Sequence, residues 1–426
     1  MSISRSLYSL IFYLAIPVVL LRLLFRAARA PSYALRWGER FGFVERQPRS
    51  LPLVWLHAVS VGESLAAVPV IRSLMSSYPE LRIFVTCMTP TGSQRIKAAF
   101  GDEIGHSYAP YDLPDAVARF LQRVTPKLLI VMETELWPNT VAACNSRNIP
   151  VLIANARLSK QSADGYARIS TLIRPMFSKL DRVAAQTNDD GLRYISLGSQ
   201  ASSVEVTGNI KFDMTLDSHA RRQASLLREQ WQGKDGRTIW LAASTHVGED
   251  EIVLDAFSII KKHMPETLLV LTPRHPERFQ DVYSKSVKAG FDVRMCSQYK
   301  TFEPTVDILI GDTMGELLIY YGACDATFVG GSLVSVGGHN VIEPAAWGKP
   351  IISGPSVYNF SEVTDLLFKA GALEFCETSQ EMAEKLIALF ADRPLANRMG
   401  VSAVGIVETN RGALDKLLNL IDGLLN

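Results

Sequence analysis

Two series of short apolar runs dominate this sequence and restrict the folds that it can adopt. Each run is long enough for one buried strand, and neighbouring runs lie roughly 25–45 residues apart, which leaves room for a crossover helix. This pattern predicts parallel strands that are buried on both faces. The first series is Leu53–His57, Arg82–Cys87, Leu128–Met132, Val151–Ala154 and Val183–Gln186, and the second is Thr238–Ala243, Leu268–Thr272, Val306–Ile310, Ala326–Gly330 and Ile351–Ser353.

The two series are separated by residues 213–237, which are polar and charged and contain no strand-like run. We therefore predict two Rossmann-like, doubly wound α/β domains that face a cleft and join near 212–236. The predicted division is a membrane anchor over 1–30, an N-terminal domain over 31–212 and a C-terminal domain over 213–426.

Composition and motifs exclude several classes of function. The formal net charge is only +1, which argues against a nucleic-acid binder that relies on overall positive charge. The five cysteines are scattered without a C-x-x-C pair, and G-x-G-x-x-G, Walker A, H-E-x-x-H and D-x-D motifs are absent. The sequence therefore implies no cofactor and no metal.

The N-terminal segment Leu7–Leu21 is almost entirely apolar, and Arg22, Arg26 and Arg29 follow it on one face of a predicted helix. Because the charges follow the apolar stretch, a retained anchor is favoured over a cleaved signal peptide, with a buried helix of a soluble domain as the other alternative. The positive-inside rule places the bulk of the chain in the cytoplasm. The length allows either a spanning or an interfacial helix. The arginines either attract anionic headgroups and phosphates or only set the topology.

Polar residues follow the predicted strands of the N-terminal domain, where ligands bind in such sheets. Glu63 lies at the start of a helix, where it can act as a capping residue or as a general base. Glu133 and Glu135 follow the strand 128–132, and either could face the cleft. Lys211 lies beside a glycine turn, where it can hold a phosphate or a carboxylate, or be a solvated surface residue.

The C-terminal domain carries a second set of candidate ligand-binding residues. Arg274 and His275 lie in a proline-rich turn suited to an anion. Met314, Gly315 and Glu316 form a turn whose N–H groups suit a phosphate. A glycine-rich loop over 330–345 leads to Asn340 and Glu343, where the carboxylate can accept ribose hydroxyls, and each of these turns could also be purely structural.

Six ordered motifs together resemble the 3-deoxy-D-manno-octulosonic acid (Kdo) transferases of lipopolysaccharide assembly. They are S-V-G-E at 60–63, E-T-E-L-W-P-N at 133–139, G-N-I-K-F-D at 208–213, P-R-H-P-E-R at 273–278, G-D-T-M-G-E-L at 311–317 and G-G-H-N-x-x-E-P-A at 337–345. The resemblance covers nearly the whole chain. It implies a GT-B fold, a CMP-Kdo donor and a lipid A precursor (lipid IVA) as acceptor at the inner face of the inner membrane.

The resemblance also implies roles for the residues in the motifs. Glu63 would be the catalytic base of an inverting, metal-independent transfer, supported by Glu133, Glu135 and Lys211. CMP would be held by Arg274, His275, Met314, Gly315, Glu316, Asn340 and Glu343. The residues Arg22, Arg26 and Arg29 would meet the anionic membrane surface and the phosphorylated acceptor. Two rival hypotheses are a GT-B enzyme with another nucleotide-sugar donor, and a non-catalytic membrane-tethered module that binds nucleotide or lipid.

Overall fold

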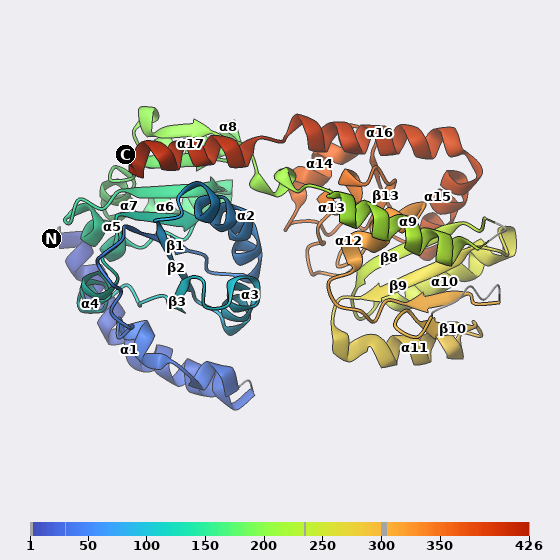
Figure 1. Ribbon diagram of the computed structural model, residues 1–426, viewed down its shortest axis with the longest axis horizontal. Helices are drawn as coiled ribbons and strands as arrows, with labels where there is room; N and C mark the ends of the chain where they lie inside the picture. The colour runs from blue at the N-terminus through green and yellow to red at the C-terminus, as the bar shows by residue number, and fades with distance from the viewer. Residues whose placement is uncertain (1–2, 30, 234–235, 300–304, 426) are drawn as a thin grey trace. The chain divides into compact units, whose positions relative to one another are not determined.

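The computed structural model describes residues 3–29, 31–233, 236–299 and 305–425, and it divides the chain into two compact units. The first unit comprises Met1–Asp213 together with Arg411–Asn426, and the second comprises Met214–Asn410. In each unit helices flank a parallel β-sheet, which is the two-domain α/β architecture predicted from the sequence (Figure 1).

The first unit contains a sheet with the strand order β3-β2-β1-β4-β5-β6-β7, in which every pair is parallel. The strands are β1 (Leu53–His57), β2 (Arg82–Cys87), β3 (Gly105–Tyr108), β4 (Leu128–Met132), β5 (Val151–Ala156), β6 (Arg182–Ala185) and β7 (Val204–Val206). The helices are α1 (Ile3–Arg29), α2 (Val61–Ser77), α3 (Pro90–Phe100), α4 (Pro114–Val124), α5 (Pro138–Asn145), α6 (Lys160–Arg168), α7 (Ser170–Phe177), α8 (Asn188–Ser196) and α17 (Ala413–Leu425), with 3₁₀ segments η1 (Pro31–Ala34), η2 (Trp37–Phe41), η3 (Ala201–Ser203) and η4 (Ile210–Asp213).

The second unit contains a sheet with the strand order β10-β11-β9-β8-β12-β13-β14, also parallel throughout. The strands are β8 (Ile239–Thr245), β9 (Leu268–Pro273), β10 (Val293–Met295), β11 (Ile308–Ile310), β12 (Ala326–Val329), β13 (Ile351–Ser353) and β14 (Leu373–Phe375). The helices are α9 (Ser218–Gln232), α10 (Glu249–His263), α11 (Phe279–Lys288), α12 (Leu317–Ala323), α13 (Ile342–Ala346), α14 (Ser361–Lys369), α15 (Ser379–Ala391) and α16 (Arg393–Thr409), with the 3₁₀ segment η5 (Pro276–Arg278).

The apolar strands are buried on both faces because helices cover both sides of each sheet. In β1, Trp55 lies in the hydrophobic cluster on one face, whereas Val54 and Leu56 lie in the cluster on the other. Successive side chains of a strand point to opposite faces, so a strand buried on both faces needs an unbroken apolar run. The continuous apolar character of these runs in the sequence follows from this packing.

The C-terminal helix α17 packs in the first unit, which corrects the predicted C-terminal domain of 213–426. Its side chains Leu417 and Ile421 are buried in the same cluster as Val54 of β1. The Asp213 carboxylate accepts hydrogen bonds from the backbone N–H groups of Gly412 and Leu414, at 2.5 and 2.6 Å, and so fixes the start of this helix. Figure 1 shows α17, in red, beside the helices and strands of the first unit.

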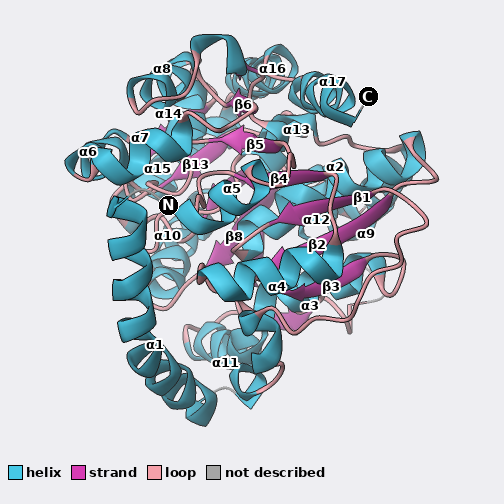
Figure 2. Cartoon of the chain, turned by 90° about the vertical axis from the view of Figure 1, so that its left-hand side faces the viewer, coloured by secondary structure: helices cyan, strands magenta, loops and turns pink. Residues whose placement is uncertain are grey.

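The N-terminal helix α1 is also part of the first unit. Figure 2 shows it as one long helix along the flank of this unit, and it contacts α5, α7 and η1. The segment Ile3–Ala28 is long and apolar enough to cross a membrane. Part of its surface packs on the protein, since Leu23 is buried with Tyr111 and Leu113.

Candidate active site

The structure places Glu63 in the first turn of α2, at the carboxyl end of β1. Ser60 caps this helix, because its hydroxyl accepts a hydrogen bond from the Glu63 N–H at 3.3 Å. The Glu63 carboxylate turns back and accepts a hydrogen bond from the Val59 N–H at 2.8 Å. Glu63 therefore makes a variant of the capping box, in which its carboxylate binds the N–H of Val59, the residue before the N-cap Ser60.

The electrostatic environment of Glu63 favours its protonated form. Burial raises the pKa of its carboxyl group, the hydrogen bonds from Val59 and Ser60 lower the pKa, and the nearby carboxylates of Glu133 and Glu135 raise it. The position at a helix N-terminus alone would lower this pKa. The net upward shift shows that burial outweighs the favourable helix end, and a raised pKa is what a general base near neutral pH requires.

Glu133 and Glu135 lie between β4 and α5 and have different environments. Glu133 has a positive φ of 59°, and its carboxylate pairs with the Lys211 ammonium at 3.4 Å. Burial raises the pKa of Glu135. Thus Glu133 is the partner of a cation, whereas Glu135 is a carboxylate in a more apolar setting.

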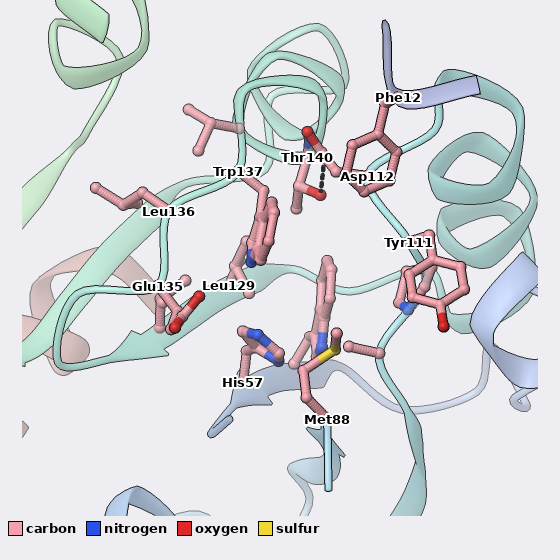
Figure 3. A pocket seen from close by; sticks show the side chains of 15 residues that line it. Phe12, His57, Met88, Tyr111, Asp112, Leu129, Glu135, Leu136, Trp137 and Thr140 are labelled. Atoms are coloured by element: carbon pink, nitrogen blue, oxygen red, sulfur yellow. Dashed lines mark hydrogen bonds between the residues drawn. The ribbon is translucent and has the colours of Figure 1, made fainter. Parts of the chain in front are cut away.

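Glu135 lines a pocket in the first unit, together with His57, Met88, Trp137 and Phe12 of α1. Figure 3 shows Glu135 and His57 close together on one side of this cavity, with Trp137, Phe12 and Tyr111 around the remainder. Of the two acidic residues after β4, Glu135 is therefore the one that faces this pocket.

His57 was not singled out in the sequence because it reads as the last residue of a buried strand. Burial lowers its pKa to about 4, so the imidazole is neutral at pH 7. Its Nδ1 lies 2.9 Å from the Thr86 hydroxyl, which already accepts a hydrogen bond from the Trp55 indole at 2.8 Å. The Thr86 hydroxyl can then donate to Nδ1, which leaves the ring proton on Nε2.

A chain of amide side chains holds the segment that carries Lys211. The Asn155 side chain accepts a hydrogen bond from the Ile210 N–H at 3.1 Å, and the Asn209 side chain donates to Gln186 at 3.1 Å. The Asn209 side chain also accepts from the Lys211 N–H at 3.1 Å. The sequence did not reveal Asn155 and Gln186, since a single amide at a strand end carries no motif.

In the second unit, three histidines cluster around the ends of β8, β9 and the loop after β12. The Nε2 atoms of His246 and His339 lie 2.8 Å apart, with the rings stacked at 5.0 Å between centroids. His275 packs edge-on to His246 at 5.4 Å. The Nε2–Nε2 contact is a hydrogen bond only if one ring carries the proton there and the other does not.

The His246 and His339 rings are neutral at pH 7 in the absence of a ligand. Burial lowers the pKa of His246, and burial together with the positive charge of Arg274 lowers the pKa of His339 to about 4. An anion bound here would raise the pKa of both histidines, because its negative charge would stabilise the protonated imidazoles.

The glycine-rich loop after β12 is held by Glu249, a residue that sequence reasoning missed. Its carboxylate is fully buried and accepts hydrogen bonds from four backbone N–H groups. These belong to His246 (2.9 Å), Gly331 (2.7 Å), Ser332 (3.0 Å) and Leu333 (2.9 Å). A Cβ atom at Gly330 would lie 2.9 Å from the Glu249 carboxylate. Gly330 therefore makes room for a carboxylate of the protein itself.

The other predicted nucleotide-binding residues surround the same strand ends. The Asn340 side chain donates a hydrogen bond to the Glu343 carboxylate at 3.0 Å and accepts one from the Ile342 N–H, at the first residue of α13, at 3.0 Å. Burial raises the pKa of Glu343, and Asn340 and Arg274 lower it. The positive charge of Arg274 thus lowers the pKa of both His339 and Glu343.

The Met314–Glu316 turn is exposed, and Gly315 has a φ of 88° that favours glycine. The Glu316 carboxylate is engaged locally, because it accepts hydrogen bonds from the hydroxyls of Thr313 at 2.5 Å and Tyr320 at 3.0 Å. This carboxylate thus stabilises its own turn, whose residues Met314, Gly315 and Glu316 are exposed.

The predicted membrane arginines lie in the last turns of α1. Arg22 and Arg26 are exposed, and the Arg26 guanidinium lies over the Tyr33 ring at 5.6 Å. The side chain of Arg29 lies outside the described residues. The basic residues are thus at the end of the helix nearest η1.

Comparison with known proteins decides the family. Residues 35–214 match the family model of the 3-deoxy-D-manno-octulosonic-acid transferases. A 3-deoxy-D-manno-octulosonic acid transferase of Haemophilus influenzae is 41% identical over 98% of both chains. The chain belongs to the Kdo transferase family. A transferase of Bordetella pertussis with the same description is 34% identical over 99% of both chains. The protein is accordingly a glycosyltransferase, as the sequence motifs indicated.

Solved structures support the fold of this Kdo transferase. The UDP-GlcNAc 2-epimerase from Neisseria meningitidis, bound to UDP-GlcNAc, superposes with a TM-score of 0.58 at 14% identity, over 87% of this chain and 99% of that chain. The S. aureus MnaA–UDP structure gives 0.57 at 14% identity, over 88% and 97%. Together with the two parallel sheets, these similarities confirm the predicted GT-B fold.

Proposed function

We propose that this Kdo transferase moves Kdo from CMP-Kdo to a lipid A precursor, lipid IVA, with inversion at the anomeric carbon and without a metal ion. The observation that carries the proposal is the environment of Glu63. It is a buried carboxylate with a raised pKa at the carboxyl end of a parallel sheet, beside two further carboxylates. The family membership supports the sugar that is transferred, and the burial and raised pKa of Glu63 support its role as the base.

The chemistry begins with the acceptor hydroxyl. Glu63 removes its proton, and the oxygen attacks the anomeric carbon of Kdo from the face opposite CMP. The new carbon–oxygen bond forms as the bond to the CMP phosphate breaks, and CMP leaves with the electron pair. Burial, with smaller contributions from the carboxylates of Glu133 and Glu135, raises the pKa of Glu63, and this makes it a stronger base than an exposed glutamate.

The second unit supplies the groups that hold CMP and stabilise its departure. Arg274 provides a permanent positive charge, and the neutral imidazoles of His246 and His339 can take up a proton when a phosphate arrives. The Met314–Glu316 turn offers backbone N–H groups to the same phosphate, and the Glu343 carboxylate suits the ribose hydroxyls. In the first unit, Lys211 is the cation suited to the carboxylate of Kdo, with Glu133 setting its position.

The acceptor is amphipathic and anionic, which fits the first unit. The apolar helix α1 attaches this unit to the cytoplasmic face of the inner membrane, and Arg22 and Arg26 lie where acidic headgroups or the acceptor phosphates would be. The family relatives support a Kdo transferase, and the apolar N-terminal helix supports a location at the membrane.

The proposal is tested with the purified full-length chain, lipid IVA and alternative donors, with the product analysed by mass spectrometry. We expect addition of Kdo residues from CMP-Kdo, no transfer from UDP-GlcNAc, inhibition by CMP but not by UMP, and full activity in the presence of a chelator. Transfer from a UDP-sugar would favour a different GT-B specificity. Binding of CMP without transfer to any lipid acceptor would favour a non-catalytic module.

A further inference from the structure

Over Leu7–Phe25, helix α1 has one exposed face that is apolar. Leu14, Val18 and Leu21 are 71%, 67% and 66% exposed. Leu7, Ile11 and Phe25 are exposed on the same side, because spacings of three and four residues place side chains on one face of a helix. An exposed apolar stripe of this length marks an interaction surface.

Helix α1 is docked on the first unit along its inner face and the flanks of that face, through polar as well as apolar contacts. The Ser4 hydroxyl donates a hydrogen bond to the Thr171 carbonyl at 3.0 Å. Ser9 is buried, with its hydroxyl 2.9 Å from the Asn139 side-chain nitrogen. Further along, Phe12 packs edge-on to Trp137, with the ring centroids 6.5 Å apart.

The docking continues towards the C-terminal end of the helix. The Tyr13 hydroxyl donates a hydrogen bond to the Asp115 carboxylate at 2.5 Å, and Leu23 is buried against Tyr111 and Leu113. The contacts from Ser4 to Leu23 therefore extend over about 29 Å at 1.5 Å per residue. This distance is about the thickness of the hydrocarbon core of a bilayer, which is roughly 30 Å.

A spanning orientation conflicts with this docking. If α1 crossed the bilayer while docked, the polar side chains beside it, including the ion pair between Asp115 and Arg119 at 2.9 Å, would lie at the depth of the hydrocarbon. If α1 left the unit in order to cross, it would expose the apolar residues Tyr111 and Leu113 and break the buried contact between Ser9 and Asn139. An orientation parallel to the membrane surface avoids both costs.

The basic residues fit the parallel orientation. At 100° per residue, Arg22 and Arg26 lie between the apolar outer face and the docked inner face, which places them at headgroup depth when the outer face enters the acyl region. Both side chains are exposed. Their positive charge complements an anionic leaflet and does not suit a second copy of the same basic helix.

We propose that α1 is an in-plane membrane helix. Its outer face, formed by Leu7, Ile11, Leu14, Val18, Leu21 and Phe25, enters one anionic leaflet while its inner face stays docked on the first unit, so that both ends of the helix lie on the cytoplasmic side. This deepens the proposed function, because it holds the site of the first unit at the surface from which a lipid acceptor is taken.

The topology is tested with epitope tags at the two ends of the full chain, in inverted inner-membrane vesicles that expose the cytoplasmic face. We expect added protease to remove both tags without detergent. Protection of the N-terminal tag until detergent is added would show a spanning helix and overturn the proposal. The assay requires no catalytic activity, so its result is independent of whether the donor and acceptor are those proposed.

The lipid contact is tested by flotation of the purified chain with vesicles of phosphatidylethanolamine and phosphatidylglycerol. We expect the double variant Leu14→Glu/Val18→Glu to lose binding, and Leu192→Glu, an equally exposed leucine on α8, to bind as the wild type. Replacing Arg22 and Arg26 by alanine should weaken binding to anionic vesicles about 25-fold, or about fivefold for each arginine, and leave binding to neutral vesicles unchanged. The proposal would be refuted if the wild-type chain did not bind the vesicles and instead dimerised through α1 in solution.

Discussion

Replacement of Glu249 by glutamine tests whether one buried carboxylate holds the glycine-rich loop of the second unit. Each carboxylate oxygen accepts hydrogen bonds from two backbone N–H groups. One oxygen serves Ser332 and Leu333, and the other serves Gly331 and His246. Glutamine has the same shape, but its amide group must face one of these two pairs of donors.

The cost of Glu249→Gln follows from that mismatch. Two buried N–H groups lose their acceptor, and each unsatisfied buried donor costs about 1–3 kcal/mol, which gives roughly 2–6 kcal/mol in the free energy of unfolding. For a domain of this size the midpoint of thermal unfolding should fall by roughly 4–24 °C. Because the loop carries His339 and Asn340, the affinity for CMP should fall as well.

Thermal and urea unfolding, together with calorimetric titration of CMP, measure both effects. The matched control is Glu251→Gln on the same helix. It removes a surface ion pair to Lys285 of α11, with an N–O distance of 2.8 Å. This variant should lose less than about 1 kcal/mol of stability and bind CMP normally. If Glu249→Gln unfolds within about 1 kcal/mol of the wild type and binds CMP unchanged, the reasoning on the loop is refuted.

Three further predictions concern the histidines, a glycine and the C-terminal helix. His339→Gln should flatten the pH dependence of CMP affinity, because in the wild type the bound anion raises the His339 pKa from about 4 and the affinity therefore rises as the pH falls. The phosphate of CMP itself titrates near pH 6, so the readout is the difference between the two proteins. Identical pH profiles would contradict the prediction. Gly354→Ala should destabilise the second unit by about 1–3 kcal/mol in urea unfolding, since the new Cβ would lie 2.3 Å from the Ser332 carbonyl oxygen; wild-type stability would contradict it. Leu417→Ala should cost about 2–5 kcal/mol and lower the protection from hydrogen exchange in the first unit, and a loss confined to the second unit would contradict the assignment of this helix.

Much of the fold could be predicted from the sequence because parallel strands buried on both faces require unbroken apolar runs. Runs such as Leu128–Met132 coincide with strands in the structure. The short strands β3, β7, β10 and β14 were missed, because segments such as Gly105–Tyr108 and Val204–Val206 contain polar residues and are too short to show a pattern. Their pairing depends on the longer strands beside them.

The C-terminal helix shows where pattern alone fails. The apolar periodicity of Ala413–Leu425 predicts an amphipathic helix, but periodicity does not reveal which of two similar cores the helix covers. In the structure the Asp213 carboxylate, about 200 residues earlier in the chain, binds the start of this helix and fixes it in the first unit. Similarly, the apolar character of α1 is visible in the sequence, whereas its docking depends on isolated polar residues such as Ser9.

The predicted site residues lie at strand ends, where a parallel sheet binds its ligands. The sequence motifs contain these residues, so they could be predicted. Glu249 was missed because an acidic residue in the first turn of a helix ordinarily serves the helix itself. Its partners Gly331, Ser332 and Leu333 lie more than 80 residues further along the chain. The glycine at position 330 is explained in part by this carboxylate, because a Cβ atom there would lie 2.9 Å from it.

The role of Glu63 is tested most directly by single-turnover transfer from CMP-Kdo to lipid IVA in the Glu63→Gln variant, with Glu103→Gln as an exposed control. We expect a rate lower by about 10²–10⁴, with CMP affinity retained. In the wild type, kcat/KM should rise with pH through the raised pKa of Glu63, because the deprotonated carboxylate is the active form. A variant that transfers Kdo at the wild-type rate, with the same pH profile, would contradict the account.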